Sequence, residues 1–212
     1  FQEMLTRRGV VNPFDEVFKP CIYLSDLIWD SIGDVVSSAR VGMDWLRNVA
    51  RICMENKVNP MWTSPSGFLV KQLYEKQASY EVKTSIGEKI RRHRLQYGRG
   101  EAAPRRNING ISPNYVHSLD AALKTLTINL SASAGVSQFA AVHDSLSTTA
   151  KHSGTLATAV RQSTVDMFTP NLLEVFRNQI ECQLPVGVEL PDVPAMGKLN
   201  ITKVMESDYY FA

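Results

Sequence analysis

The stretch AAVHDSLSTT, residues 140–149, carries the side chains of this chain best suited to chemistry. We expect two short strands to meet at His143 and Asp144, which would place the Asp144 carboxylate at the tip of a tight hairpin. Magnesium prefers oxygen ligands and tolerates little geometric slack, so a rigidly held carboxylate suits it. Two-metal phosphoryl transfer needs at least two acidic residues, because its ions lie about 3.5–4 Å apart. Asp144 alone therefore leaves two interpretations open, a metal ligand or a structural aspartate.

His117 is the second candidate for chemistry. Apolar residues at helical spacing predict a helix that begins near His117 and Ser118, with Ser118 as its cap. These residues are Leu119, Leu123, Leu126 and Leu130. Gly110 and Pro113 are expected to end whatever precedes this helix. His117 would then lie near the positive end of the helix dipole, and a capping or core histidine is an equal alternative to a ligand-binding one.

A basic segment lies in the middle of the chain. Between positions 89 and 106 seven basic residues face one acid, Glu101; they are Lys89, Arg91, Arg92, Arg94, Arg99, Arg105 and Arg106. Residues 77–110 are poor in large apolar groups, so we predict a basic loop. Lys and Arg contacts to phosphate supply most non-specific affinity for nucleic acid. The loop is therefore either a solvated, mobile segment or a phosphate-binding one, with Arg91, Arg92 and Arg94 as its candidates.

Composition and motif content exclude several function classes. No Gly-rich phosphate loop, G-x-S-x-G, H-E-x-x-H or C-x-x-C motif is present. The formal net charge is only +2, so any nucleic-acid role must come from local clustering. Cys21, Cys53 and Cys182 are far apart, which predicts a reduced intracellular protein. No apolar stretch reaches the roughly 18–20 residues that span a bilayer, so we expect no membrane partner.

The periodicity of the first half predicts a long helix and a hairpin. Apolar residues at steps of three and four indicate an amphipathic helix over residues 21–55, broken near Gly42. Pro, Gly and aromatic residues over 58–76 then predict a hairpin with its turn at Ser64–Gly67.

The second half is expected to be mainly helical as well. Gly135 should end the helix that begins at 117–118, and further helices are predicted over 155–168 and 171–183. The Pro- and Gly-punctuated tail should be extended, with one short helix near Ile201–Glu206. Long helices around small antiparallel elements make the predicted fold class α+β, predominantly helical.

Four segments of the chain match one family's motifs in the same order. They are MWTSPSGF at 61–68, GISPNYVHSLDA at 110–121, FAAVHDSLST at 139–148 and MESDYYFA at 205–212. Together they resemble single-subunit, bacteriophage-type DNA-dependent RNA polymerases, including mitochondrial relatives. SSARVGMDWLRNVAR, before the first segment, resembles the family's upstream helix. The resemblance covers nearly the whole chain and is weakest across 77–106.

The resemblance implies roles for individual residues. Asp144 would be one of two palm aspartates that hold two catalytic Mg²⁺ ions, and His143 would support the hairpin and the primer end. The terminal Phe211 and Ala212 would tuck back near the active centre. A further group would lie against the template–transcript base pair from the minor-groove side: His117, Asn114, Tyr115 and Ser118.

The resemblance also implies a fold and its partners. The chain would be the C-terminal fingers and palm portion of a right-hand polymerase with a small antiparallel palm hairpin. Residues 1–117 would be fingers-derived, 118–154 would form the palm helix and catalytic hairpin, and 155–212 would pack back on the palm. The family's second aspartate and nucleotide-binding helix lie upstream of the matched region. We therefore expect them, and the remaining ligands of both ions, in residues outside this chain or in a second polymerase chain.

The function implied is templated nucleotidyl transfer with a DNA template, an RNA transcript and ribonucleoside triphosphates. One alternative is a non-catalytic nucleic-acid-binding or assembly subunit that retains the fold. Another is a related single-chain DNA polymerase fragment, against which Ser145 and the PNYVHS segment argue. The expected location is the cytoplasm of an infected bacterial host. A virion and the mitochondrial matrix are the less favoured alternatives.

Overall fold

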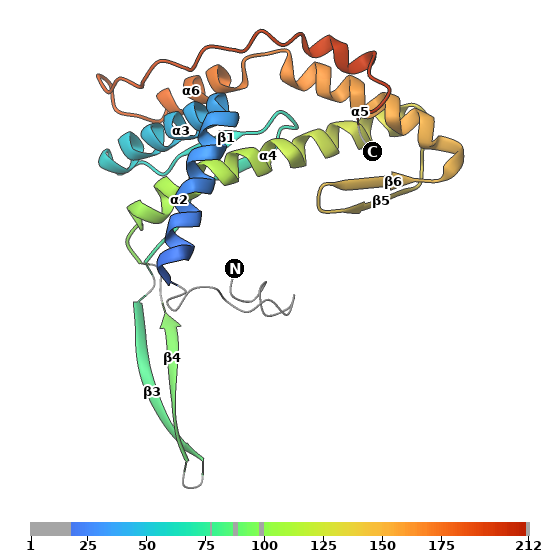
Figure 1. The fold of residues 1–212 in the computed structure, drawn as a ribbon. Helices are drawn as coiled ribbons and strands as arrows, with labels where there is room; N and C mark the ends of the chain where they lie inside the picture. The colour runs from blue at the N-terminus through green and yellow to red at the C-terminus, as the bar shows by residue number, and fades with distance from the viewer. Residues whose placement is uncertain (1–17, 77, 87–88, 98–99, 211–212) are drawn as a thin grey trace. The chain divides into compact units, whose positions relative to one another are not determined.

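A computed structural model of the chain describes residues 18–76, 78–86, 89–97 and 100–210. Helices dominate, and all paired strands form two-stranded antiparallel hairpins, so the α+β class is confirmed for this part of the chain (Figure 1). The described residues separate into two compact units, divided between Asp44 and Trp45. The elements are α2 (Phe18–Val35), α3 (Ser37–Glu55), β1 (Met61–Thr63), β2 (Leu69–Lys71), β3 (Ala78–Ile86), β4 (Lys89–Tyr97), α4 (Pro104–Ser133), β5 (Phe139–Val142), β6 (Ser145–Thr148), η1 (Ala150–His152), α5 (Ser153–Phe168), α6 (Leu172–Glu181) and η2 (Ile201–Met205).

The first helical stretch divides at a different place from the one predicted. α2 ends at Val35 and α3 begins at Ser37, whereas Gly42 lies inside α3. A single glycine in a helix interior costs only about 1 kcal/mol, which neighbouring helical residues tolerate. The break falls instead in the run Val35–Ser38, where β-branched valines and serines all have weak helix propensity.

The core of the second unit is an aromatic cluster to which four elements contribute. The ring centroid of Phe176 in α6 lies 4.9 Å from that of Tyr115 and 5.6 Å from that of Trp62. The Trp45 ring of α3 lies 6.1 Å from the same Phe176 ring. The polar tips are satisfied: Tyr115 Oη donates to Leu172 O at 2.9 Å. These edge-to-face contacts fix α3, β1, α4 and α6 against one another.

Cys53 lies on the α3 face of this core and is fully buried. Burial raises the pKa of its thiol to about 11, because a thiolate would lose its hydration there. The thiolate is the reactive form, so iodoacetamide at pH 8 should alkylate exposed Cys182 while Cys53 reacts at least about 100-fold more slowly. The rate at Cys53 should rise about tenfold per pH unit up to about pH 11. Mass mapping of each cysteine measures this, and equal rates in the folded chain would contradict it.

The first hairpin confirms the predicted turn at Ser64–Gly67. Ser64 N donates to Phe68 O at 2.8 Å, and Gly67 adopts a left-handed φ of 84°. Two glutamine side chains, one from α6 and one just after it, hold the outer edge of β1. Gln183 both accepts from Met61 N at 3.0 Å and donates to Met61 O at 2.6 Å, and Gln179 accepts from Thr63 N at 2.7 Å. Side-chain amides thus satisfy a strand edge that would otherwise stay open.

The long helix α4 begins well before the predicted start at 117–118. It runs from Pro104 to Ser133 through both expected breakers, so Ser118 is not a cap and His117 is not in the first turn. Pro104 occupies the first turn, where its missing N–H costs nothing. Pro113 removes only the donor to the Asn109 carbonyl, and Asn109 is exposed to water. At Gly110 a Cβ would lie 2.8 Å from the Tyr74 ring, so this glycine serves a close approach and not a turn.

The segment predicted as a basic loop is a second hairpin, β3–β4. The strands pair antiparallel from Ala78↔Tyr97 to Ile86↔Lys89. Charges at alternate positions replaced the apolar alternation by which a strand is usually recognised. Tyr74 O accepts from Ala103 N at 2.7 Å and Lys76 N donates to Glu101 O at 2.8 Å, so paired backbone continues from the hairpin to the start of α4.

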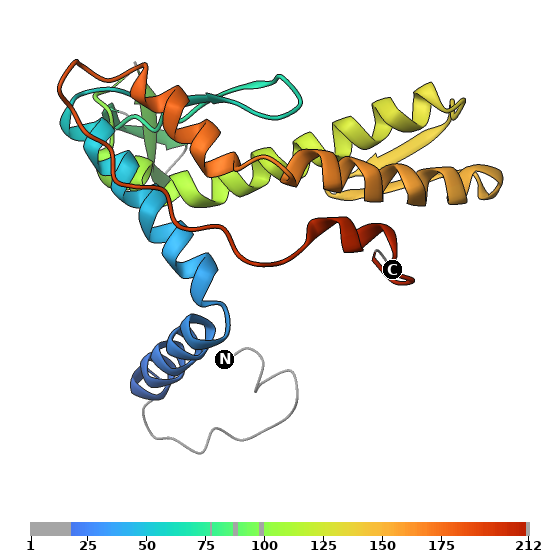
Figure 2. The ribbon, with the colours of Figure 1, turned by 90° about the horizontal axis from the view of Figure 1, so that it is seen from above.

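The C-terminal elements follow the predictions closely. α5 and α6 match the expected helices, and Asn171 caps α6 by accepting from Glu174 N at 3.3 Å. Gly135, with φ 90°, follows the end of α4 as expected. The extended tail carries one short 3-10 turn, η2, where a short helix was predicted. α4 and α5 lie beside one another, with β6 against α5 (Figure 2).

Candidate functional site

The predicted strand–turn–strand at His143 and Asp144 is confirmed. β5 and β6 pair up to Val142↔Ser145, so His143 and Asp144 form a two-residue turn. His143 has a left-handed φ of 53°, a conformation for which such turns usually employ glycine. Both side chains are exposed. The hairpin therefore presents the Asp144 carboxylate at its tip, on a strained but paired backbone.

Lys124 of α4 bonds directly to this turn. Its Nζ donates to the carbonyl oxygen of His143 at 2.8 Å. That carbonyl belongs to the same planar peptide unit as the Asp144 N–H. A long helix that packs in the core is thereby tied to the backbone immediately before Asp144.

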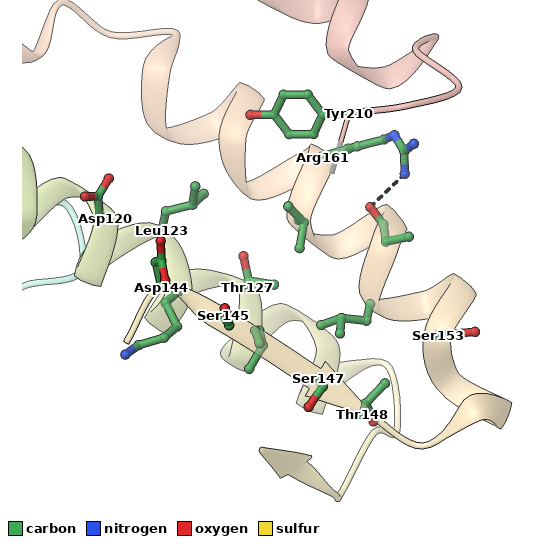
Figure 3. Close-up of a pocket in the computed structure, with 15 residues that line it drawn as sticks. Asp120, Leu123, Thr127, Asp144, Ser145, Ser147, Thr148, Ser153, Arg161 and Tyr210 are labelled. Carbon is green, nitrogen blue, oxygen red and sulfur yellow. Dashed lines mark hydrogen bonds between the residues drawn. The ribbon is translucent and has the colours of Figure 1, made fainter. Parts of the chain in front are cut away.

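A cavity of about 750 Å³ lies between α4, the β5–β6 hairpin and α5. Asp120 and Asp144 both line it, so α4 adds a second carboxylate to the one at the turn (Figure 3). Lys124 and Arg161 contribute cationic groups, and Tyr210 reaches it from the tail. The hydroxyls of the lining are those of Thr127, Ser145, Ser147, Thr148, Ser153 and Tyr210. The cavity is thus rich in oxygen donors with two cations among them.

The tail beside this cavity is held by α5. Arg161 donates to Ser207 O at 3.0 Å and to Asp208 O at 3.4 Å, and Tyr210 Oη bonds Thr164 Oγ1 at 3.1 Å. Phe211 and Ala212, expected near the active centre, lie outside the described residues. The residues just before them do reach the cavity that Asp144 lines.

The four residues expected against the base pair take different positions in the structure. Tyr115 is buried in the aromatic core. Asn114 Nδ2 donates to Gln72 Oε1 at 2.7 Å, and Ser118 Oγ accepts from Trp62 Nε1 at 3.0 Å while donating to Tyr115 O at 2.6 Å. His117 alone of this group is exposed. With Asn114 and Ser118 it lines a second cavity of about 610 Å³ against the β1–β2 turn, separate from the one at Asp144.

The candidate phosphate contacts lie on the β3–β4 hairpin and are all exposed. Strand alternation places Arg92 and Arg94 on one face and Arg91 on the other. Arg94 is paired with Glu81 across the strands, and Arg92 lies 3.5 Å from the same carboxylate. Strand pairing therefore places Glu81 beside the basic residues of β4, although Glu81 lies outside residues 89–106 in the sequence.

The metal-binding capacity of the described residues is partial. No three His, Cys, Asp or Glu side chains among them form a group that could hold an ion. The oxygen donors at Asp120 and Asp144 suit a hard divalent cation, but they do not complete a coordination shell. The site thus fits magnesium as one part of a larger donor set.

Four residues of this cavity were missed from the sequence. Asp120 had a signal, because it lies in the quoted segment GISPNYVHSLDA three residues after His117. Tyr210 had a similar signal, because it lies in the tail segment MESDYYFA. Lys124 and Arg161 had none, since each reaches a partner 19 or more residues away.

None of the helices in the described part of the chain is both long and apolar enough to cross a membrane.

Comparison with known proteins identifies the family. A family model described as DNA-dependent RNA polymerase matches residues 2–187. "DNA-directed RNA polymerase 1, mitochondrial" of Nicotiana sylvestris is 31% identical over 209 residues, 98% of this chain and 20% of the relative. "DNA-directed RNA polymerase" of Enterobacteria phage K11 is 30% identical over 208 residues, 90% of this chain and 23% of the relative. "DNA-directed RNA polymerase 2, chloroplastic/mitochondrial" of Arabidopsis thaliana is 30% identical over 98% of this chain and 20% of the relative.

The chain thus spans about a fifth of the length of these three relatives. The family model covers most of the chain, and both phage and organellar polymerases are similar to the chain. The four motifs in their order predicted this family. The chain belongs to the family of single-subunit, bacteriophage-type DNA-dependent RNA polymerases.

Proposed function

We propose that this chain forms part of the active centre of a DNA-templated RNA polymerase and that Asp144 is one of its metal ligands. The observation that carries the proposal is the exposed carboxylate at the tip of a paired hairpin, beside a cavity rich in oxygen donors, in a chain of this family. The substrates would be a DNA template, an RNA 3′ end and ribonucleoside triphosphates.

The chemistry assigned to these residues is electrostatic. Bound Mg²⁺ would lower the pKa of the RNA 3′-hydroxyl and neutralise charge on the triphosphate. Asp144 would hold it with a carboxylate oxygen, and His143 would support the turn and the primer end. The second aspartate and the nucleotide-binding helix would come from polypeptide outside these 212 residues, in the same or another chain.

We narrow the proposed contact with the base pair to His117. Its imidazole is exposed, whereas Asn114, Tyr115 and Ser118 make hydrogen bonds within the protein. We assign His117 the direct contact with the template–transcript pair and the other three the task of holding α4 against the β1–β2 hairpin. Residues 118–154 remain our proposal for the palm portion; the boundary at 117 falls inside α4, which carries both His117 and Lys124.

A templated primer-extension assay tests the proposal on a complete polymerase that contains this chain. Extension should require Mg²⁺, cease on chelation and return when the metal is restored. A complete polymerase that binds DNA but never extends a primer would favour a non-catalytic nucleic-acid-binding or assembly subunit instead. The matched relatives come from a phage and from plant organelles at nearly equal identity, and we keep the infected bacterial cytoplasm as the proposed location.

The β3–β4 arginines give a second test, of nucleic-acid contact. Each Arg that neutralises a phosphate contributes about one unit to the slope of log K against log salt. Because Arg91 lies on the opposite face from Arg92 and Arg94, one duplex docked on one face should depend on only one set. We expect either Arg91→Ala or the pair Arg92→Ala, Arg94→Ala to flatten the slope, and the other to leave it unchanged.

Fluorescence anisotropy with a short DNA duplex, titrated between about 50 and 200 mM KCl, measures both slopes. Arg51→Ala is the matched control, since Arg51 is an exposed arginine of α3. Identical slopes in all four proteins would show that the hairpin does not contact phosphate.

A further inference from the structure

The backbone on which Asp144 depends is held in an unfavourable conformation. His143 is left-handed at φ 53°, which costs a residue with a Cβ roughly 1 kcal/mol or more. Such a conformation persists only where surrounding contacts fix it. In this turn the strand pairing at Val142↔Ser145 fixes the two ends, and the bond of Lys124 Nζ to the His143 carbonyl, 2.8 Å long, is the side-chain contact to the turn itself.

The position of this bond matters more than its strength. The carbonyl that accepts from Lys124 and the amide nitrogen of Asp144 share one planar peptide unit. A fixed carbonyl direction therefore sets the orientation of the whole peptide plane. Because the Asp144 Cα lies in that plane, its position and the direction in which the side chain leaves it are set as well. Without the bond, the peptide plane of this exposed turn is free to rotate and the carboxylate moves with it.

Lys124 itself is well placed to act as a fixed point. It is half-buried, and it lies on α4 between Ala122 and Thr127, both buried against the rest of the unit. It also lies seven residues, about two helical turns, after His117 and so on a similar side of α4. One rigid helix thus carries both the residue assigned to the base pair and the bond to the turn of Asp144.

We propose that Lys124 is a positioning residue for Asp144: it orients the His143–Asp144 peptide so that the carboxylate points at the metal position, and it couples that position to α4. The inference rests on the proposed function of Asp144. Partners that orient metal ligands typically matter by 10–100-fold in metal affinity or activity.

The test uses Lys124→Met, which keeps most of the side-chain length and removes the donor, and Lys124→Arg, which restores a donor. In the complete polymerase, Lys124→Met should lower kcat about 10-fold or more and raise the Mg²⁺ concentration for half-maximal rate by a similar factor, with the KM for nucleotide little changed. Lys124→Arg should recover most of both losses. Lys151→Met, an exposed lysine of η1, is the control and should change neither.

Two readouts do not depend on turnover. Mn²⁺ titration followed by electron paramagnetic resonance should show weaker binding to the Lys124→Met polymerase. In the chain itself, the ¹⁵N shift of the Asp144 amide should move in Lys124→Met and return in Lys124→Arg, because this nitrogen shares the peptide with the accepting carbonyl.

The outcomes separate this inference from the proposed function. If Lys124→Met retains wild-type kcat and metal dependence, or if Lys124→Arg is as impaired as Lys124→Met, the positioning role is overturned. If Asp144 itself proves dispensable for extension, the proposed function fails first, whatever the amide shift of Lys124→Met does.

Discussion

Replacing Asp144 by asparagine should lower the rate of primer extension at least about 1,000-fold in a complete polymerase, equivalent to about 4 kcal/mol of transition-state stabilisation. Asparagine keeps the shape and one oxygen but removes the negative charge that a hard divalent cation requires. The exposed turn tolerates the change structurally, because the Asp144 side chain packs in no core. The loss should therefore appear in single-turnover extension, while affinity for the template stays within about twofold of wild type.

Asp166→Asn provides the control for the Asp144 variant. Asp166 is an exposed carboxylate of α5 outside the cavity, and its Oδ1 accepts from Gln162 Nε2 at 2.7 Å, a bond that asparagine can also accept. The Asp166→Asn polymerase should extend primers at the wild-type rate. Extension by Asp144→Asn at a rate near that of Asp166→Asn would remove Asp144 from the catalytic site.

The β5–β6 hairpin was predictable from the sequence because its signals are local. A short apolar run precedes the two-residue turn and a hydroxyl-rich strand follows it, and the family motif identifies His143 and Asp144 within the turn. The turn at Ser64–Gly67 was predictable for the same reason, since Pro65 and Gly67 favour turns wherever they occur. In both hairpins the residues that signal the strands and the turn lie within a few positions of one another.

The start of α4 and the β3–β4 hairpin could not be predicted in this way, because their conformation depends on distant partners. Gly110 lies inside a helix, where its missing Cβ leaves room for the Tyr74 ring, and Tyr74 lies 36 positions earlier. In β4, Arg92 and Arg94 stand where a buried strand would have apolar residues, and their neighbour Glu81 comes from the other strand.

The same argument holds for the site itself. Asp144 was identified, but the atoms that fix it were not, because Lys124 meets the turn across 19 positions and Arg161 meets the tail across 46. Contacts over 19 or 46 positions follow neither the helical nor the strand repeat, so a sequence pattern does not show them. Local motif residues thus identify the candidate group, whereas the residues that contact its backbone can be found only from the fold.

Asn107 shows how strongly such a distant contact can matter, and replacing it gives the second large expected effect. Asn107 is fully buried, and its side chain accepts from Tyr74 N at 2.9 Å and donates to Tyr74 O at 3.0 Å and Ala103 O at 3.1 Å. Leucine has a similar volume but satisfies none of these groups. Tyr74 N is left unpaired, which costs about 1–3 kcal/mol, whereas Tyr74 O and Ala103 O keep backbone partners and lose one hydrogen bond each, worth about 0.5–1.5 kcal/mol. Asn107→Leu should therefore lower the free energy of unfolding by about 3–5 kcal/mol.

Asn109→Leu is the matched control, because Asn109 is exposed two positions along the same helix. Circular dichroism during guanidinium unfolding should give a midpoint far below wild type for Asn107→Leu and one close to wild type for Asn109→Leu. Because Asn107 bonds the chain just before the β3–β4 hairpin to the start of α4, the DNA binding that we propose for that hairpin should weaken in the same variant even where the helices remain folded. Equal stability of the two variants would mean that water or local rearrangement satisfies Tyr74, and that α4 begins at Pro104 without help from this contact.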